Sequence, residues 1–341
     1  MIEGYDLSGA GSGYNIMMPV KPMHPNAAKL YLNWFLSKEG QTAVMPQSDG
    51  EPDPTLPPPS SIRNEYDQER EAARSDSRIF VFFLDEYHVR DTNAMRMTAP
   101  LVEFVETQLA PTDLVAVMYP LTPLFDVQLT RDHARVVRAL QTFRGRKYKY
   151  EPENVFEQQY AYYPTTTVER IRNDVSLSAL KGLAVHLGGL REGRKSVIVV
   201  SEGYSNYVPP QLRNERAAGG GRIADERRNP FAGDDSLEER MMFFENASIL
   251  NDFRYVADTA NKNNTSLYMV DPRGLAVFEY DVSLPSVAPQ VDGRVLRNLQ
   301  GTLYTLADLT DGRAVVQDMT LREVTYHHLL LPAHQVIWAN R

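Results

Sequence analysis

The sequence predicts an α/β protein with a Rossmann-like open, mostly parallel sheet and helices on both faces. Residues 79–84 form an apolar run without polar alternation, which is typical of a strand buried on both faces of a sheet. Similar short apolar runs alternate along the chain with longer segments of helical periodicity. Several of these runs end on polar residues, and functional sites of open α/β sheets collect where parallel strands end.

Composition limits the function classes. The chain has 341 residues, 43% hydrophobic and 23% charged, as in globular proteins of one large or two ordinary domains. Its net charge of −8 argues against nucleic acid or an anionic membrane as partner. The absence of cysteine excludes disulfides, thiolate catalysis and cysteine-ligated zinc. No apolar stretch reaches the roughly 20 residues of a membrane span, and residues 1–6 lack a signal-peptide pattern.

Two segments precede the predicted sheet. Residues 1–45 are expected to be a helical fragment, with one helix over 25–38 and Gly40 after it, too small to bury a core alone. Residues 46–76 are expected to be a linker and lead-in, because the part up to residue 60 is rich in proline and has polyproline character.

The sheet domain is predicted over residues 77–317, followed by a divergent tail at 318–341. Strands are expected at 79–84, 114–119, 196–200, 266–270 and 313–316. Helices are expected near 94–109, 131–142, 167–190, 238–262 and 296–308. Right-handed crossovers then place the carboxyl end of every strand on one rim of the sheet. We interpret 145–163 as an irregular excursion and 205–236 as a long solvated loop.

Asp85 is the first candidate ligand, because it follows the buried strand 79–84 directly. A carboxylate there, with hydroxyls two and four residues later, would form a set of oxygen ligands for Mg²⁺ or Ca²⁺. Those positions hold Tyr87 and Val89, which are poor or impossible ligands. The alternative is that Asp85 caps the following loop or helix by hydrogen bonds to the backbone.

Glu202 and Ser176 complete the set of candidate metal ligands. Glu202 follows the second buried strand and is expected on the same rim as Asp85, either sharing a metal or solvated in a loop. Ser176 stands in a segment, 173–180, that we interpret as a helix start, where capping is the simpler role. Asp174 is the other polar residue there that could face the rim. Asp271 and Arg273 are expected to pair or to fix a turn.

No catalytic constellation is evident. The chain contains neither His-Glu-x-x-His nor Gly-x-Ser-x-Gly, and the glycines at 9, 11 and 13 lack the context of a phosphate-binding loop. We therefore expect a non-enzymatic protein. A metal-dependent hydrolase that uses Asp85, Glu202 and His88 is the enzyme-class alternative.

Over about 77–317 the sequence resembles a von Willebrand factor type A domain, of the VWFA-related type common in acidobacterial genomes. The segments that carry the resemblance are 77–85, 109–118, 196–203, 257–274 and 306–314. In that family a metal-ion-dependent adhesion site uses Asp-x-Ser-x-Ser, a threonine and a further aspartate. Asp85 matches the first residue, Tyr87 and Val89 depart from both serines, Ser176 or Asp174 lies near the threonine, and Glu202 lies near the last aspartate. The resemblance implies an adhesion-type domain with a degenerate metal site.

The resemblance also implies a protein partner and an extracytoplasmic location, periplasmic or secreted. Residues 23–41 are similar to a helix near the C-terminus of periplasmic solute-binding proteins, but most of that fold is absent. A chimeric gene product without a function as a unit is therefore a third hypothesis.

Overall fold

The computed structural model describes residues 2–5, 16–19, 54–219, 221–222, 236–280 and 284–316. The helix expected over 25–38 and the tail at 318–341 lie outside these residues. Strands β1 (Ile2–Tyr5) and β2 (Ile16–Pro19), which we did not predict, form an antiparallel pair. Among the described residues, no helix is long and apolar enough to cross a membrane.

A five-stranded sheet forms the centre of the molecule, and all of its strand pairs are parallel. The spatial order of the strands is β4-β3-β5-β8-β9. Their bounds are β3 Ile79–Leu84, β4 Leu114–Met118, β5 Lys195–Val200, β8 Thr265–Val270 and β9 Ala314–Val315. The predicted fold class is confirmed. Since the chain winds outward from β3 to β4 and then crosses back to β5, the order reverses between β3 and β5, where open α/β sheets bind ligands.

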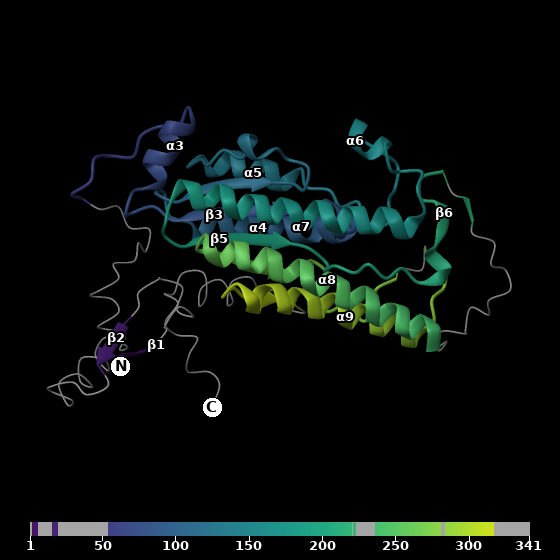
Figure 1. The fold of residues 1–341 in the computed structure, drawn as a ribbon. Helices are drawn as coiled ribbons and strands as arrows, with labels where there is room; N and C mark the ends of the chain where they lie inside the picture. The colour runs from purple at the N-terminus through teal and green to yellow at the C-terminus, as the bar shows by residue number, and fades with distance from the viewer. Residues whose placement is uncertain are drawn as a thin grey trace.

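Helices cover both faces of the sheet (Figure 1). Helices α4 and α5 pack on one face, and α7, α8 and α9 pack on the other. Their bounds are α4 Asp91–Gln108, α5 His133–Gln141, α7 Thr165–Leu190, α8 Ser236–Lys262 and α9 Pro289–Leu309. All five were expected from periodicity; the ends differ by up to three residues, except that α9 begins seven residues before the predicted start at 296.

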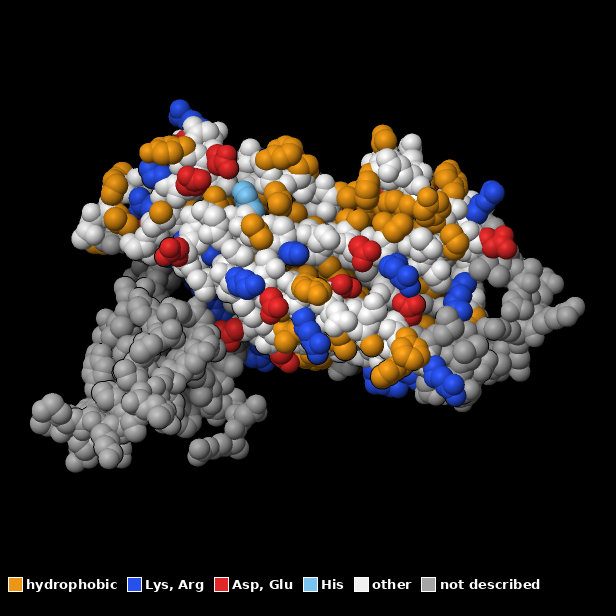
Figure 2. Space-filling view, viewed as in Figure 1, with side chains coloured by type: hydrophobic (Ala, Val, Ile, Leu, Met, Phe, Trp, Pro, Cys, Tyr) orange, Lys and Arg blue, Asp and Glu red, His pale blue; other side chains and the backbone are white. Residues whose placement is uncertain are grey.

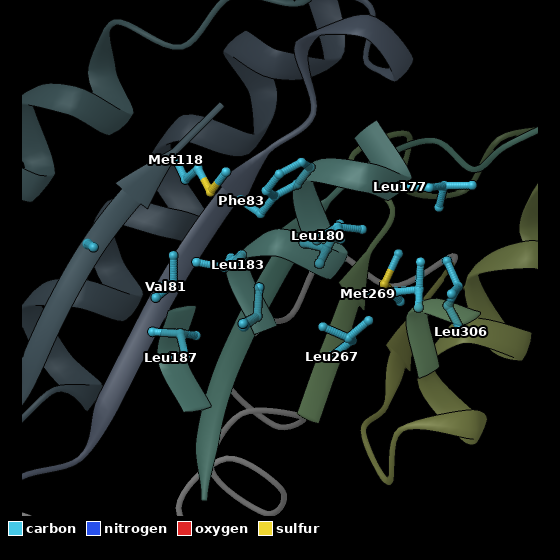
Figure 3. Close-up of a cluster of buried hydrophobic side chains, with 14 of the residues drawn as sticks. Val81, Phe83, Met118, Leu177, Leu180, Leu183, Leu187, Leu267, Met269 and Leu306 are labelled. Carbon is cyan, nitrogen blue, oxygen red and sulfur yellow. The ribbon is translucent and has the colours of Figure 1, made fainter. Parts of the chain in front are cut away.

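Strand β3 shows why the apolar run is a central strand. All six of its residues are buried, and alternate side chains enter opposite layers of the core. Val81 and Phe83 meet leucines of α7, together with Leu267, Met269 and Leu306 (Figure 3). Phe80 and Phe82 pack edge-on against Phe104 of α4 on the other face. Burying each large apolar side chain contributes about 1.5–3 kcal/mol, so this strand is a main source of stability.

Three segments differ from the sequence-based expectation. The stretch expected as linker and lead-in contains α3 (Glu65–Ala72), whose Asn64 side chain caps the N–H of Asp67. The excursion at 145–163 contains a short helix, α6 (Val155–Gln158), and much of it is buried. The described part of the long loop is not solvated throughout, because Asn206, Tyr207 and Val208 are buried and strands β6 (Asn214–Arg216) and β7 (Gly221–Arg222) follow. Residues 223–235 of that loop lie outside the described residues.

Candidate functional site

The loops that follow β3 and β5 meet at the point where the strand order reverses. The Asp85 N–H donates to Val200 O at 3.1 Å, and the Glu202 N–H donates to His88 O at 3.0 Å. A three-residue 3₁₀ turn, Glu86–His88, then reverses the chain toward α4. These bonds place the residues after β3 directly beside those after β5.

Five side chains converge there, and we call them the Asp85 cluster: Asp85, His88, Ser176, Ser201 and Tyr204. The Ser176 hydroxyl donates to one Asp85 oxygen at 2.9 Å, and the Ser201 hydroxyl donates to the other at 3.1 Å. His88 Nδ1 lies 2.9 Å from both oxygens. All five residues are buried, and Asp85 has no exposed surface.

The partners of Asp85 keep its carboxylate ionised. Burial alone would raise the pKa of Asp85, but the attraction to His88 and the hydrogen bonds from His88 and Ser176 lower it below its usual value. Because an ionised carboxylate only accepts hydrogen bonds, Nδ1 of His88 carries a proton. Burial, followed by the charge of Asp85, raises the pKa of Tyr204 well above its usual value, so the phenol stays neutral.

His88 is fixed in this position from several sides. Its ring packs against Tyr204, with the ring centroids 4.8 Å apart. The loop that carries it is held by the Arg146 N–H, which donates to Glu86 O, and the Lys147 N–H, which donates to Val89 O. The Nε2 atom is buried and has no hydrogen-bond partner among the described residues.

Gly203 allows the chain to turn sharply after β5. Its φ is +94°, and a Cβ at this position would lie 2.3 Å from Leu299 O of α9, so only glycine fits. The side chains around this turn have different partners. Ser201 and Tyr204 contact residues of the Asp85 cluster, whereas Glu202 points away and accepts from Asn93.

Glu202 belongs to a second buried group, which we call the Glu202–Glu279 network: Arg90, Lys147, Glu202, Arg273 and Glu279. Glu202 accepts from the Arg90 N–H at 2.8 Å and from the Asn93 amide at 2.7 Å. Lys147 Nζ bridges Glu202 at 3.1 Å and Glu279 at 2.6 Å. The network therefore ties together the segments that follow β3, α5, β5 and β8.

Arg273 closes the network at the end of β8. Its guanidinium binds both oxygens of Asp271 and also Glu279, at 2.6 Å, so the expected pairing of Asp271 with Arg273 is present. Burial opposes ionisation of Glu279, but Lys147, Arg273 and Arg90 outweigh it and lower the pKa of Glu279 to about 2. Each buried carboxylate here has a cation beside it.

Of the three candidate metal ligands, the structure brings Asp85 and Ser176 together and directs Glu202 to other partners. The interpretation of 173–180 as a helix start is wrong, since α7 begins at Thr165 and Ser176 lies three turns inside it. Asp174 is exposed on the same helix and does not join the cluster. Tyr87 donates to Glu157 at 2.8 Å, and Val89 packs in the core.

The residues present do not fit a divalent ion. No group of three or more His, Asp or Glu side chains in the described part of the chain is placed to share a metal. Both Asp85 oxygens already accept from His88 and a serine hydroxyl, and a cation would have to displace these donors.

The cluster also lacks the geometry of a hydrolytic triad. Ser176 Oγ lies 3.5 Å from His88 Nδ1, the same nitrogen that Asp85 engages. In a triad the serine faces the nitrogen opposite the carboxylate, and here Nε2 has no hydroxyl partner in the described residues. Sequence reasoning missed Ser201 and Tyr204, although both lie within two residues of Gly203, the glycine that follows β5.

No model of a known protein family matches the chain, and no curated protein is significantly similar to it.

Proposed function

We propose that the protein is a non-enzymatic, adhesion-type protein-interaction domain, related to von Willebrand factor type A domains, in which a histidine replaces the rim metal. The observation that carries the proposal is the contact of His88 Nδ1 with both oxygens of Asp85, at 2.9 Å. Asp85 lies at the end of β3, and side chains of the same chain donate the hydrogen bonds that its carboxylate accepts.

The replacement has a simple electrostatic basis. A buried carboxylate needs positive charge or several hydrogen-bond donors, and a divalent ion is one source of that charge. In the Asp85 cluster an imidazole N–H and two hydroxyls supply the donors. Because no surface of Asp85 is exposed, a partner cannot reach it through a shared ion without rearrangement of the rim.

The loops of the rim offer a partner apolar surface instead. Several large apolar side chains on or beside these loops are exposed: Val155, Phe156, Tyr162 and Tyr163 between α5 and α7, Phe243 and Phe244 in the first turns of α8, and Leu275, Val277 and Phe278 after β8. Figure 2 shows hydrophobic side chains gathered beside α6. Contiguous exposed apolar surface is typical of protein-binding sites.

The Glu202–Glu279 network makes this surface rigid. Arg90, Lys147 and Arg273 come from three different loops and bind the same two buried carboxylates. A surface held in its binding conformation loses less conformational entropy on association. The network therefore supports a binding function in the loops.

Metal dependence is tested by the melting temperature of the full chain in EDTA and in millimolar Mg²⁺, Ca²⁺ or Mn²⁺. A metal that binds only the native state would add about 2.7 kcal/mol at a hundredfold excess over its dissociation constant. We expect no change. A rise that is lost in Asp85→Ala would overturn the histidine replacement.

Partner binding is tested by affinity capture from an extracytoplasmic extract of the source organism, with and without EDTA. We expect a protein that the wild-type chain retains in both buffers and that the double variant Tyr162→Ser/Tyr163→Ser does not. Both tyrosines are exposed, so this variant should fold. Capture that requires a divalent ion, or that is equal in both chains, would contradict the proposal. An exported protein in the periplasm or outside the cell is the expected setting.

The metal-dependent hydrolase receives no support from the geometry. It requires Glu202 beside Asp85 and His88, and Glu202 is bound instead by Arg90, Asn93 and Lys147.

A further inference from the structure

A compact aromatic surface surrounds α6, and we call it the α6 patch: Val155, Phe156, Tyr162 and Tyr163. Val155 is 74% exposed, and the two tyrosines are 59% and 51% exposed. Figure 2 shows hydrophobic side chains gathered in one area beside α6, on the side toward α7. Exposed apolar side chains that gather in one contiguous area are typical of an interaction site, whereas single ones are common on any surface.

The α6 patch is fixed to the domain beneath it. Glu157 of α6 accepts from both terminal nitrogens of Arg146, at 2.6 and 2.8 Å, and from the Tyr87 hydroxyl. The Ala217 N–H donates to Tyr163 O, and the Ala218 N–H donates to Ala161 O. The exposed rings therefore stand on a backbone held from two sides, as a preformed binding surface requires.

Three consecutive prolines, Pro57, Pro58 and Pro59, are exposed at another place in the chain. Proline fixes φ near −65° and disfavours a helical conformation in the residue before it, so such a run takes the extended polyproline conformation. The run is anchored at its start, where Arg74 Nη1 donates to Pro57 O at 2.7 Å. An extended proline segment loses little entropy when it binds, and exposed aromatic rings are the surface on which such segments dock.

The prolines and the α6 patch lie at opposite ends of the molecule. Figure 1 shows α3, which follows the prolines, at one end of the sheet, and α6 at the other. Ser60, next to the run, bonds Glu71 of α3, which keeps the prolines at that end. The two surfaces cannot meet within one chain, so a contact between them joins two copies.

Charge favours the same pairing. The exposed carboxylate of Glu151 flanks the α6 patch, beside Glu153, which already pairs with Arg146 at 3.1 Å. The exposed Arg63 stands four residues after Pro59. In a complex of the two surfaces these side chains can approach each other with opposite charge, which fixes the direction of the docked segment.

We propose that the α6 patch binds the Pro57–Pro59 segment of a second copy of this chain. The inference rests on the proposed function, since it names the partner of one part of the rim surface. The contact is head-to-tail, because the two surfaces that meet are different. Contacts of this type continue into rings or open chains unless one end is blocked.

The test is sedimentation velocity of the full chain over a range from micromolar to several hundred micromolar. The patch variant is Tyr162→Ser/Tyr163→Ser, and the proline variant is Pro57→Ser/Pro58→Ser/Pro59→Ser. All five positions are exposed, and circular dichroism melting checks that both variants fold. We expect the wild type to grow beyond a dimer with concentration, and each variant alone to remain monomeric.

A mixture of the two variants is the decisive measurement. The patch variant keeps its prolines and the proline variant keeps its patch, so the mixture should form a one-to-one dimer that cannot extend. A wild type that stays monomeric at every concentration overturns the inference. So does association that survives in the proline variant alone, because the occupant of the patch is then another segment.

Failure of this inference is distinguishable from failure of the proposed function. If the chain does not self-associate but still captures a partner through Tyr162 and Tyr163, only the inference about its own prolines is wrong. If capture does not depend on these tyrosines, the proposed binding function of the rim loops is wrong.

Discussion

His88 Nδ1 lies 2.9 Å from each carboxylate oxygen of Asp85, three residues earlier in the chain. This contact places an imidazole against the acid at the switch point of the sheet. The turn Glu86–His88 makes it geometrically accessible, because one 3₁₀ turn returns the chain to the end of β3. The carboxylate of Asp85 is therefore hydrogen-bonded by a residue of the loop that follows it.

Replacing Asp85 by alanine should therefore destabilise the fold independently of any metal. The change leaves His88, Ser176 and Ser201 buried without their acceptor, and loss of one partner of a buried pair costs about 3–5 kcal/mol. Urea unfolding followed by circular dichroism should show this loss equally in EDTA and in Mg²⁺. The exposed Glu106→Ala serves as control and should stay within about 0.5 kcal/mol of wild type.

A double-mutant cycle separates the pair from the rest of the cluster. If Asp85 and His88 stabilise each other, Asp85→Ala/His88→Ala costs less than the sum of the two single changes. Simple additivity would mean that the two side chains act independently, which contradicts a stabilising contact between Asp85 and His88.

Gly145→Ala should destabilise the rim by a different route. A Cβ at Gly145 would lie 2.2 Å from Val89 O and 2.5 Å from the carbonyl carbon of Arg90, so the 145–147 segment would move away from the loop that carries His88. We expect a loss of about 2–3 kcal/mol in urea unfolding, as for other overpacked sites. Gly189→Ala is the matched control: its Cβ meets nothing within 4 Å inside α7, and better helix propensity should add up to about 1 kcal/mol. Equal effects at both glycines would disprove the steric argument.

Glu157 should make the fold sensitive to acid. Burial opposes its ionisation, but Arg146, the Glu153 N–H and Tyr87 outweigh it and lower the pKa to about 2 from an ordinary 4.5. A carboxyl whose pKa is lowered by folding contributes its full stabilisation at pH values above its pKa in the unfolded chain. That contribution is lost as the pH falls from about 4.5 to 2. Glu157→Gln should cost about 3 kcal/mol at pH 7 and much less near pH 2, measured by urea unfolding across this range. The neighbouring Glu153 is exposed, and Glu153→Gln should change stability by less than about 1 kcal/mol at either pH.

The sheet was predictable from the sequence because buried parallel strands leave a local signal. Residues 79–84 and 197–200 are short apolar runs, and strands buried on both faces leave this pattern in the sequence. Helix α6 was missed because four residues hold too little periodicity, and its position depends on Arg146 rather than on its own sequence.

The partners of the site residues were less predictable, because they are set by direction and long-range contacts. Ser201 and Glu202 are adjacent, yet the serine donates to Asp85 while the acid accepts from Lys147. Tyr87 stands two residues after Asp85 but donates to Glu157, seventy residues later. Neither choice can be derived from spacing along the chain.

Glu86 should make the fold less stable as the pH rises from about 4.5 to 7. Burial raises the pKa of Glu86 from 4.5 to about 7, and Glu157, Glu153 and Asp85 add to the shift against the opposing effect of Arg146. A carboxyl with a raised pKa holds its proton in the folded state after the unfolded chain has lost it, so stability falls over that interval and the full cost is present above about pH 7. A shift of this size corresponds to at most about 3 kcal/mol.

Glu86→Gln, which keeps the shape and removes the charge, should be more stable than wild type at pH 8 and equal to it near pH 4.5, in urea unfolding at both values. The control is Glu106→Gln, on the exposed side of α4, whose free energy of unfolding should equal that of wild type at both pH values. If Glu86→Gln is no more stable than wild type at pH 8, the charge of Glu86 is solvated and the prediction is wrong.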